Sequence, residues 1–205
     1  MTKPFALNNI LSRASSINER VLPLNDAIKV AQLLEKMDIF AAQATNFVET
    51  LKNDPQIEMD DIRKKIRDIW YKDATIIDQF MSSPEFQMLD EIDKQTVTSW
   101  KQFRIEGRFI CTKYFPEFAV LTCLDHQELQ GVFFGVRAIA EDFERIFPIK
   151  PPFIIETTLL AYKDSIIWDG IGRVADFACN RVQAKYFYEQ SKKVRRDGQI
   201  VTKLS

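Results

Sequence analysis

A short run of the chain, from Trp168 to Arg173, combines residue types that could bind a small ligand. Gly170 and Gly172 allow the backbone to approach a bound molecule closely, while Asp169 and Arg173 present opposite charges. We therefore take Trp168, Asp169, Gly170 and Arg173 as candidate ligand-binding residues. The alternative is structural: a strand end with a glycine-rich turn and an Asp-Arg pair.

Basic residues gather near the C-terminus. Residues 171–205 hold eight basic and three acidic side chains, whereas residues 109–170 hold five basic and nine acidic ones. Tyr186 and Tyr188 lie among the basic residues, and cations beside aromatic rings are typical of surfaces that contact phosphates or stack on bases. The candidate nucleic-acid-binding residues are Lys192, Lys193, Arg195 and Arg196. Alternatively, these cations simply suit the negative end of a helix dipole.

His126 is the single histidine, and Asp125 and Glu128 lie beside it. Such a group could form an acid-base pair or part of a metal site. His126 and Glu128 match the His-x-Glu of zinc deaminases, but the Pro-Cys-x-x-Cys that completes that metal site is missing from the sequence. The segment is therefore interpreted as a polar hairpin loop.

Other motifs that carry chemistry are missing from the sequence. There is no glycine-rich nucleotide loop of either common type and no Gly-x-Ser-x-Gly segment. Cys111, Cys123 and Cys179 are widely spaced in apolar surroundings, which fits reduced core thiols. Carboxylate clusters, interpreted as solvated helix faces, occur at Asp60-Asp61, Asp90-Glu91-Asp93 and Glu141-Asp142-Glu144. We expect no catalytic residue set, no metal site and no cofactor.

The elements that position these residues change character near residue 107. Residues 1–106 predict a helical region with a short N-terminal helix and about three long antiparallel ones, beginning near Asn25, Met59 and Ser82. In the third, Ser82 and Glu85 have the spacing of a capping box, and Gly107 would end it. Residues 107–205 predict a β-rich region.

Within this β-rich region, runs rich in Phe, Val, Ile and Thr predict a three-strand meander. Two strands that are apolar on both faces, joined at Lys163-Asp164, predict a hairpin, and an edge strand follows. The predicted meander strands are 109–115, 118–124 and 129–136, the hairpin strands are 153–162 and 165–171, and the edge strand is 199–202. A short helix is predicted at 139–147 and a C-terminal helix at 174–196. The fold class is α+β, with N-terminal antiparallel helices followed by a small, mostly antiparallel sheet or partial barrel of five to six strands and a C-terminal helix.

Composition is that of an ordinary globular protein. The 205 residues are 46% hydrophobic and 28% charged with a net charge of -1, so disorder is not expected. The longest uncharged apolar stretches have fewer than a dozen residues, against about 20 for a membrane span. We expect a cytoplasmic protein with no membrane association.

Several C-terminal segments carry a family resemblance. They are Trp100-Lys101-Gln102-Phe103 after Ser99, Gly107-Arg108-Phe109-Ile110, Leu159 to Gly170 and Ile200-Val201-Thr202-Lys203-Leu204. Over residues 75–205 this pattern resembles a family of hypothetical bacterial proteins, mainly Gram-positive, with no known activity. The sequence departs from that pattern at Ala161, Tyr162, Trp168 and Lys203. The resemblance implies a shared fold and a cytoplasmic context, and it implies no catalytic residue.

These observations predict a non-enzymatic interaction or regulatory module that binds a protein partner or a second copy of itself. Two alternatives stay open: nucleic-acid binding through the basic C-terminal helix, and an enzyme or small-ligand binder at the Trp168–Arg173 segment.

Overall fold

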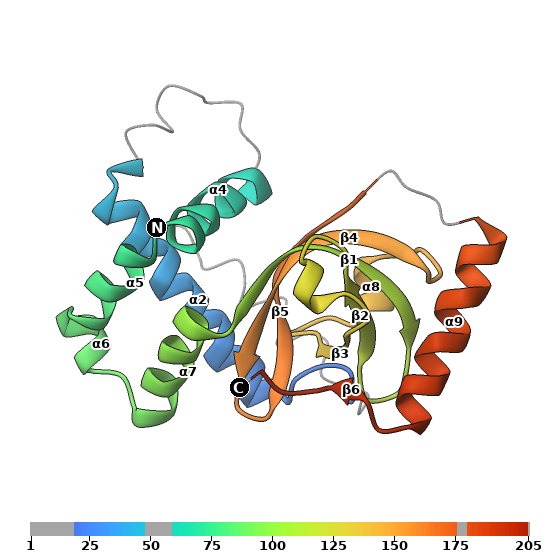
Figure 1. The fold of residues 1–205 in the computed structure, drawn as a ribbon. Helices are drawn as coiled ribbons and strands as arrows, with labels where there is room; N and C mark the ends of the chain where they lie inside the picture. The colour runs from blue at the N-terminus through green and yellow to red at the C-terminus, as the bar shows by residue number, and fades with distance from the viewer. Residues whose placement is uncertain (1–18, 48–58, 176–179, 205) are drawn as a thin grey trace. The chain divides into compact units, whose positions relative to one another are not determined.

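The computed structural model describes residues 19–47, 59–175 and 180–204 (Figure 1). Its contacts divide the chain into two compact units. The helical unit is Lys29–Gln102, and the sheet unit is the chain up to Ile28 together with Phe103 onward. The sequence placed the change at residue 107 and grouped everything before it with the helices. The short N-terminal helix expected before residue 19 lies outside the described residues.

In the helical unit, polar caps divide the long helices that the sequence predicted. The described elements are α2 (Leu24–Ala44, which begins in the sheet unit), α4 (Met59–Lys72), α5 (Ala74–Met81), α6 (Pro84–Gln87) and α7 (Glu91–Gln102). The prediction of one continuous second helix was wrong. The Asp73 carboxylate accepts a hydrogen bond from the Thr75 backbone N–H and caps a new helix, α5. In the next segment Ser83, and not Ser82, caps α6 through the Phe86 backbone N–H.

The core of the helical unit is aromatic. Trp70 and Trp100 are both fully buried and their rings stack with centroids 6.2 Å apart. Asp38 accepts hydrogen bonds from Arg67 Nε at 2.8 Å and Arg67 Nη2 at 2.7 Å, and from Trp70 Nε1 at 2.9 Å. The Asp38 carboxylate therefore holds both the buried guanidinium of Arg67 and the indole of Trp70 in place.

The sheet unit contains a six-stranded mixed sheet that returns on itself. Its strands are β1 (Arg104–Tyr114), β2 (Ala119–Cys123), β3 (Phe133–Arg137), β4 (Phe153–Tyr162), β5 (Ser165–Val174) and β6 (Ile200–Val201). The order is β2-β1-β4-β5-β3-β6, and an additional β2–β3 pairing closes a ring. The meander, the hairpin, the edge strand and the α+β class are confirmed. Gly107 lies inside β1 and does not end the preceding helix.

Strand β3 joins the two halves of the ring. Its one edge pairs antiparallel with β2. Its other edge pairs parallel with β6 at Phe133 and Phe134, and then with β5 at Val136 and Arg137. These two parallel pairings were not expected, although the sheet is mostly antiparallel as predicted. In β4, residues of both faces are buried, which fits strands covered on both sides.

Among the described residues, two α-helices lie wholly within the sheet unit, which also holds the 3-10 helix η1 (Gln127–Leu129). Helix α8 (Phe143–Ile146) is shorter than the expected 139–147. Helix α9 (Arg181–Arg196) lies beside the strands in Figure 1 and contacts β1. It begins later than the predicted residue 174, because β5 continues to Val174 and the Asn180 side chain forms a capping box with Gln183.

No helix in the described part of the chain is long and apolar enough to cross a membrane.

Candidate nucleic-acid interface

Helix α9 is held on the sheet by a narrow buried face. Ser191 is fully buried and its Oγ lies 2.7 Å from the Thr112 hydroxyl of β1, which itself donates to the Val120 carbonyl at 3.1 Å. Val194 is also buried and packs with Phe115, Val120 and Phe133. Because the attachment uses one face, the rest of this helix lies in solvent.

The solvent side of α9 carries a stripe of cations. A helix turns about 100° per residue, so residues spaced by 4, 3, 4 and 3 positions stay on one face. Exposed residues with this spacing form what we name the cationic stripe: Arg181, Lys185, Tyr188, Lys192 and Arg195. With a rise of 1.5 Å per residue, the stripe spans about 21 Å.

At the middle of the stripe, the ammonium groups of two lysines contact the ring of Tyr188. The Lys113 Nζ of β1 lies 4.2 Å from the Tyr188 ring centroid, and the Lys192 Nζ lies 4.5 Å from it. Hydrogen bonding from Lys113 and the charges of both lysines lower the pKa of Tyr188 from its ordinary value. Within the described residues neither lysine has a carboxylate partner. The positive charge there is therefore uncompensated.

Arg195 plays a different part at the end of the stripe. Its Nη2 lies 2.8 Å from Glu117 Oε1, and its guanidinium carbon lies 4.0 Å from the centroid of the Phe115 ring. These contacts tie the last turn of α9 to the β1–β2 connection, so the charge of Arg195 is already paired.

The structure separates the four basic residues singled out from the sequence. It brings Lys192 and Arg195 together with Lys113, whereas Lys193 lies about 100° round the helix from Lys192. Arg196 follows Lys192 by four positions and therefore borders the stripe. Arg196 Nε contacts the neighbouring Asp197 at 3.2 Å, and Lys193 is exposed. Arg181 and Lys185 were missed as members, although their spacing from Lys192 could have revealed them. Lys113 gave no signal, because it comes from a different element.

The Trp168–Arg173 segment lies inside β5 and not in an open loop. Asp169 is buried, with its Oδ1 3.0 Å from the Ile171 backbone N and 3.3 Å from the Thr157 hydroxyl. Trp168 packs against Phe143 and Phe147 with ring centroids 5.3 Å and 5.5 Å away. The other two candidates, Gly170 and Arg173, are exposed. A ligand-binding role for these four residues stays a prediction.

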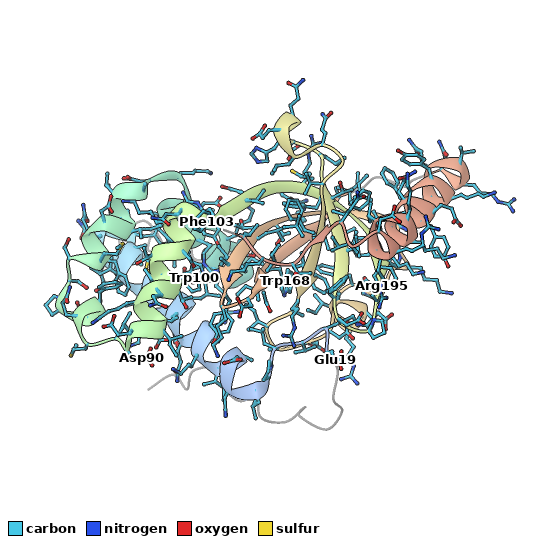
Figure 2. The ribbon with its side chains drawn as sticks, turned by 60° about the horizontal axis from the view of Figure 1, so that its bottom comes forward. Glu19, Asp90, Trp100, Phe103, Trp168 and Arg195 are labelled. Atoms are coloured by element: carbon cyan, nitrogen blue, oxygen red, sulfur yellow. The ribbon has the colours of Figure 1, made fainter. Side chains whose placement is uncertain are left out.

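Figure 2 shows Trp168 among the strands and Arg195 on α9, so the two sets of candidate residues occupy different parts of the sheet unit.

The group around His126 is occupied by structural contacts. Asp125 accepts from the Arg108 side chain at 2.7 Å and 2.9 Å and from the Arg108 backbone N–H at 2.7 Å. His126 Nε2 donates to the Glu106 carbonyl at 2.8 Å. These bonds tie the β2–β3 connection to β1, as a polar hairpin loop would. Cys111 and Cys123 are buried thiols, burial raises the pKa of Cys111 to about 12, and Cys179 lies outside the described residues.

Comparison with protein-family models, curated proteins and solved structures found no match. The family resemblance of residues 75–205 therefore stays a prediction.

Proposed function

We propose that this protein binds nucleic acid through the cationic stripe of α9 and the adjoining Lys113 of β1. The observation that carries the proposal is the pair of ammonium groups on Tyr188, which lack a carboxylate partner in the described part of the chain. A phosphate oxygen placed between them would compensate both charges. The proposal narrows the broader expectation of a non-enzymatic interaction module, which stays a prediction with respect to protein partners.

The length of the stripe supports a polymer over a single small anion. Four cations of one helix face extend over about 21 Å, so successive phosphates of one strand could contact successive turns. Helix α9 carries six basic residues and one acidic residue, although the whole chain has a net charge of -1. A local field of this kind recruits a polyanion even when the whole protein is nearly neutral.

An exposed aromatic side chain within the stripe favours a single strand. Tyr188 is 41% exposed. A solvent-exposed phenol ring offers a face on which an unpaired base can stack, and such stacking is worth about 1–3 kcal/mol per base.

The test compares two double variants with the same change in charge. Lys113→Ala with Lys192→Ala removes the two ammonium groups at Tyr188, and Lys193→Ala with Arg196→Ala removes two exposed charges of the same helix that do not contact Tyr188. Affinity for a fluorescent single-stranded oligonucleotide would be measured by anisotropy at low salt. We expect a loss of roughly tenfold or more for the first variant and a distinctly smaller loss for the second.

Equal losses in the two variants would mean that net charge, and not the stripe, governs binding. An unmodified protein that binds neither single- nor double-stranded DNA or RNA at low salt would refute the proposal.

A further inference from the structure

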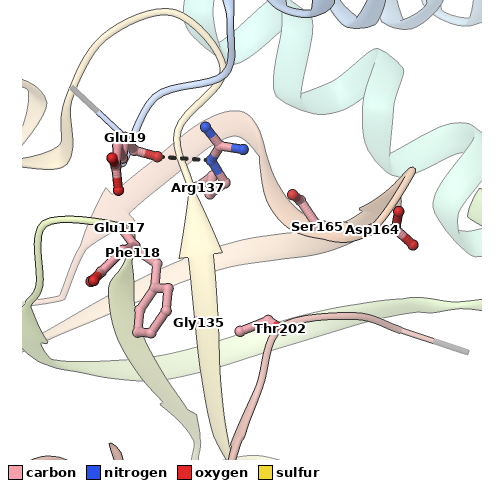
Figure 3. A pocket seen from close by; sticks show the side chains of 8 residues that line it. All are labelled: Glu19, Glu117, Phe118, Gly135, Arg137, Asp164, Ser165 and Thr202. Atoms are coloured by element: carbon pink, nitrogen blue, oxygen red, sulfur yellow. Dashed lines mark hydrogen bonds between the residues drawn. The ribbon is translucent and has the colours of Figure 1, made fainter. Parts of the chain in front are cut away.

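A second site lies in the sheet unit, at the end of β3. It is a cavity of about 330 Å³, which we name the Arg137 cavity. Its lining residues come from β3, the β1–β2 connection, the β4–β5 turn, the start of β5 and the segments before α2 and after β6: Glu19, Glu117, Phe118, Gly135, Arg137, Asp164, Ser165 and Thr202. Figure 3 shows them around the C-terminal end of β3.

Arg137 is held rigidly without being neutralised. Its Nε donates to the Glu19 carbonyl at 2.9 Å, and its Nη2 donates to the Val21 carbonyl at 2.9 Å. Both acceptors are uncharged, and within the described residues no carboxylate forms an ion pair with this guanidinium. Burial lowers the pKa of Arg137, and the charges of Asp26 and Glu19 only partly offset this effect. Donors on Nη1 remain for a ligand.

Two of the three carboxylates at the cavity already have cationic partners. Glu117 pairs with Arg195 at 2.8 Å, and Asp164 pairs with Lys203 at 2.7 Å. Glu19 has no ion pair among the described residues and is exposed. The cavity thus presents one fixed guanidinium and one unpaired carboxylate.

The remaining lining gives a small ligand both polar and apolar contacts. The Ser165 and Thr202 hydroxyls can each donate or accept a hydrogen bond. Phe118 forms an apolar wall, because Gly135 has no side chain: a β-carbon there would lie 3.0 Å from Phe118 Cγ and 3.1 Å from Ile200 Cγ2. Gly135 therefore lets Phe118 and Ile200 close onto β3.

We infer that the Arg137 cavity binds a small zwitterion of the amino-acid class, with its carboxylate on Arg137 and the hydroxyls, its ammonium toward Glu19 and its apolar part against Phe118. A guanidinium fork matches a planar carboxylate. The nearby carboxylates disfavour a ligand of higher negative charge such as phosphate and favour a cationic group on the same molecule. The inference is independent of the nucleic-acid proposal, because it uses none of the stripe residues except Arg195 as a partner of Glu117.

The test measures binding of free amino acids to the whole protein by isothermal titration calorimetry. The twenty L-amino acids are screened first, and the best binder is then compared with its N-acetyl derivative, its amide and inorganic phosphate. We expect the zwitterion to bind, and each blocked derivative to bind at least about tenfold more weakly, because a charged hydrogen-bonding group is lost.

Two variants separate the roles of the charged groups. Arg137→Gln should abolish binding of the best amino acid. Arg137 also hydrogen-bonds to the backbone carbonyls of residues 19 and 21, so its loss could disturb the fold. Glu19→Gln is therefore the second variant, because residue 19 keeps its backbone carbonyl. Glu19→Gln should weaken binding of the zwitterion but leave binding of the N-acetyl derivative nearly unchanged. The inference is overturned if no amino acid binds, if the amide or phosphate binds as tightly as the zwitterion, or if Glu19→Gln affects both ligands equally.

Discussion

The backbone at Gly172 leaves no room for a side chain. A β-carbon there would lie 2.8 Å from Trp168 Cζ3, 2.8 Å from Ile155 Cδ1 and 3.1 Å from Phe147 Cζ. The Ile155 methyl group can rotate away, but Trp168 is fixed among aromatic rings. We expect Gly172→Ala to lower the free energy of unfolding by about 1–3 kcal/mol, as overpacking does. Urea denaturation measures this change.

The control is Arg173→Ala, the exposed neighbour in the same strand, which should change stability by less than about 0.5 kcal/mol. A Gly172→Ala variant as stable as that control would show that the aromatic cluster can rearrange.

Asp38 makes a second prediction at the residue scale. Its carboxylate accepts two hydrogen bonds from Arg67, whose side chain is only 6% exposed, and one from the core Trp70. Asp38→Ala removes the carboxylate that accepts from this buried guanidinium, and removing one member of a buried pair costs about 3–5 kcal/mol. Thermal and urea unfolding would report the loss.

The exposed pair of Lys94 and Glu91, with N and O 3.1 Å apart, supplies the comparison for Asp38. Glu91→Ala should cost less than about 1 kcal/mol. Similar losses in the two variants would contradict the structural importance of the Asp38 network.

At the scale of elements, binding depends on the order of α9. Asn180 caps its first turn by accepting hydrogen bonds from the Val182 and Gln183 N–H groups, both at 3.0 Å. Asn180→Ala should destabilise the first turn by about 1 kcal/mol, whereas Asn180→Asp should keep the cap. Hydrogen exchange of the α9 amides should increase in the first variant alone, and oligonucleotide affinity should fall with it. Unchanged exchange in Asn180→Ala would contradict the role of this cap.

Local patterns predicted most elements but not all of their ends or partners. The apolar runs of β4 and β5 and the turn residues between them identified this hairpin. The caps at Asp73 and Ser83 were missed, since each interrupts an apolar stripe that continues on both sides. The parallel pairing of β3 with β5 and β6 joins segments far apart in sequence, and no local periodicity records such a pairing.

The site was predicted in the same partial way. Basic residues on α9 were evident in the sequence, and helical spacing would have sorted Lys192 and Arg195 from Lys193. Lys113 could not be found, because only the docking of Ser191 on Thr112 brings β1 beside this face. The Arg137 cavity was likewise missed, since it is assembled from separate connections around β3.

Acid should destabilise the whole molecule. The aspartates whose pKa values lie below the ordinary value are Asp26, Asp73, Asp90, Asp125 and Asp164. Groups with a lowered folded-state pKa stabilise the fold above the unfolded-state pKa of about 3.9, and this stabilisation disappears as the pH falls through the folded-state values. Stability measured by urea denaturation should therefore be steady near neutral pH and decline below about pH 4.

Asp26 offers the variant for this pH prediction. Burial raises its pKa, but hydrogen bonds from Lys163 and Tyr162 outweigh that effect and lower it. Asp26→Asn should therefore be less stable than the unmodified protein near pH 7 and should lose less stability on acidification. An unchanged pH profile in Asp26→Asn would contradict the assignment.

The near-zero net charge of the whole chain conceals an uneven distribution. Acidic residues predominate over 109–170 and basic ones over 171–205, and α9 exposes most of its cations. Because the numbers of basic and acidic residues are nearly equal, binding of a polyanion must depend on the cations of one face. Substituting those cations would not make the whole protein strongly acidic.

The salt dependence of oligonucleotide affinity tests the central claim most directly. The logarithm of the association constant for a single strand would be measured against the logarithm of salt concentration, for the unmodified protein and for Lys113→Ala with Lys192→Ala. We predict a linear decline in both, with a slope shallower by about 1.4 in the double variant, since each phosphate contact on a single strand contributes about 0.7. Equal slopes in the two proteins, or affinity independent of salt, would contradict nucleic-acid binding at this stripe.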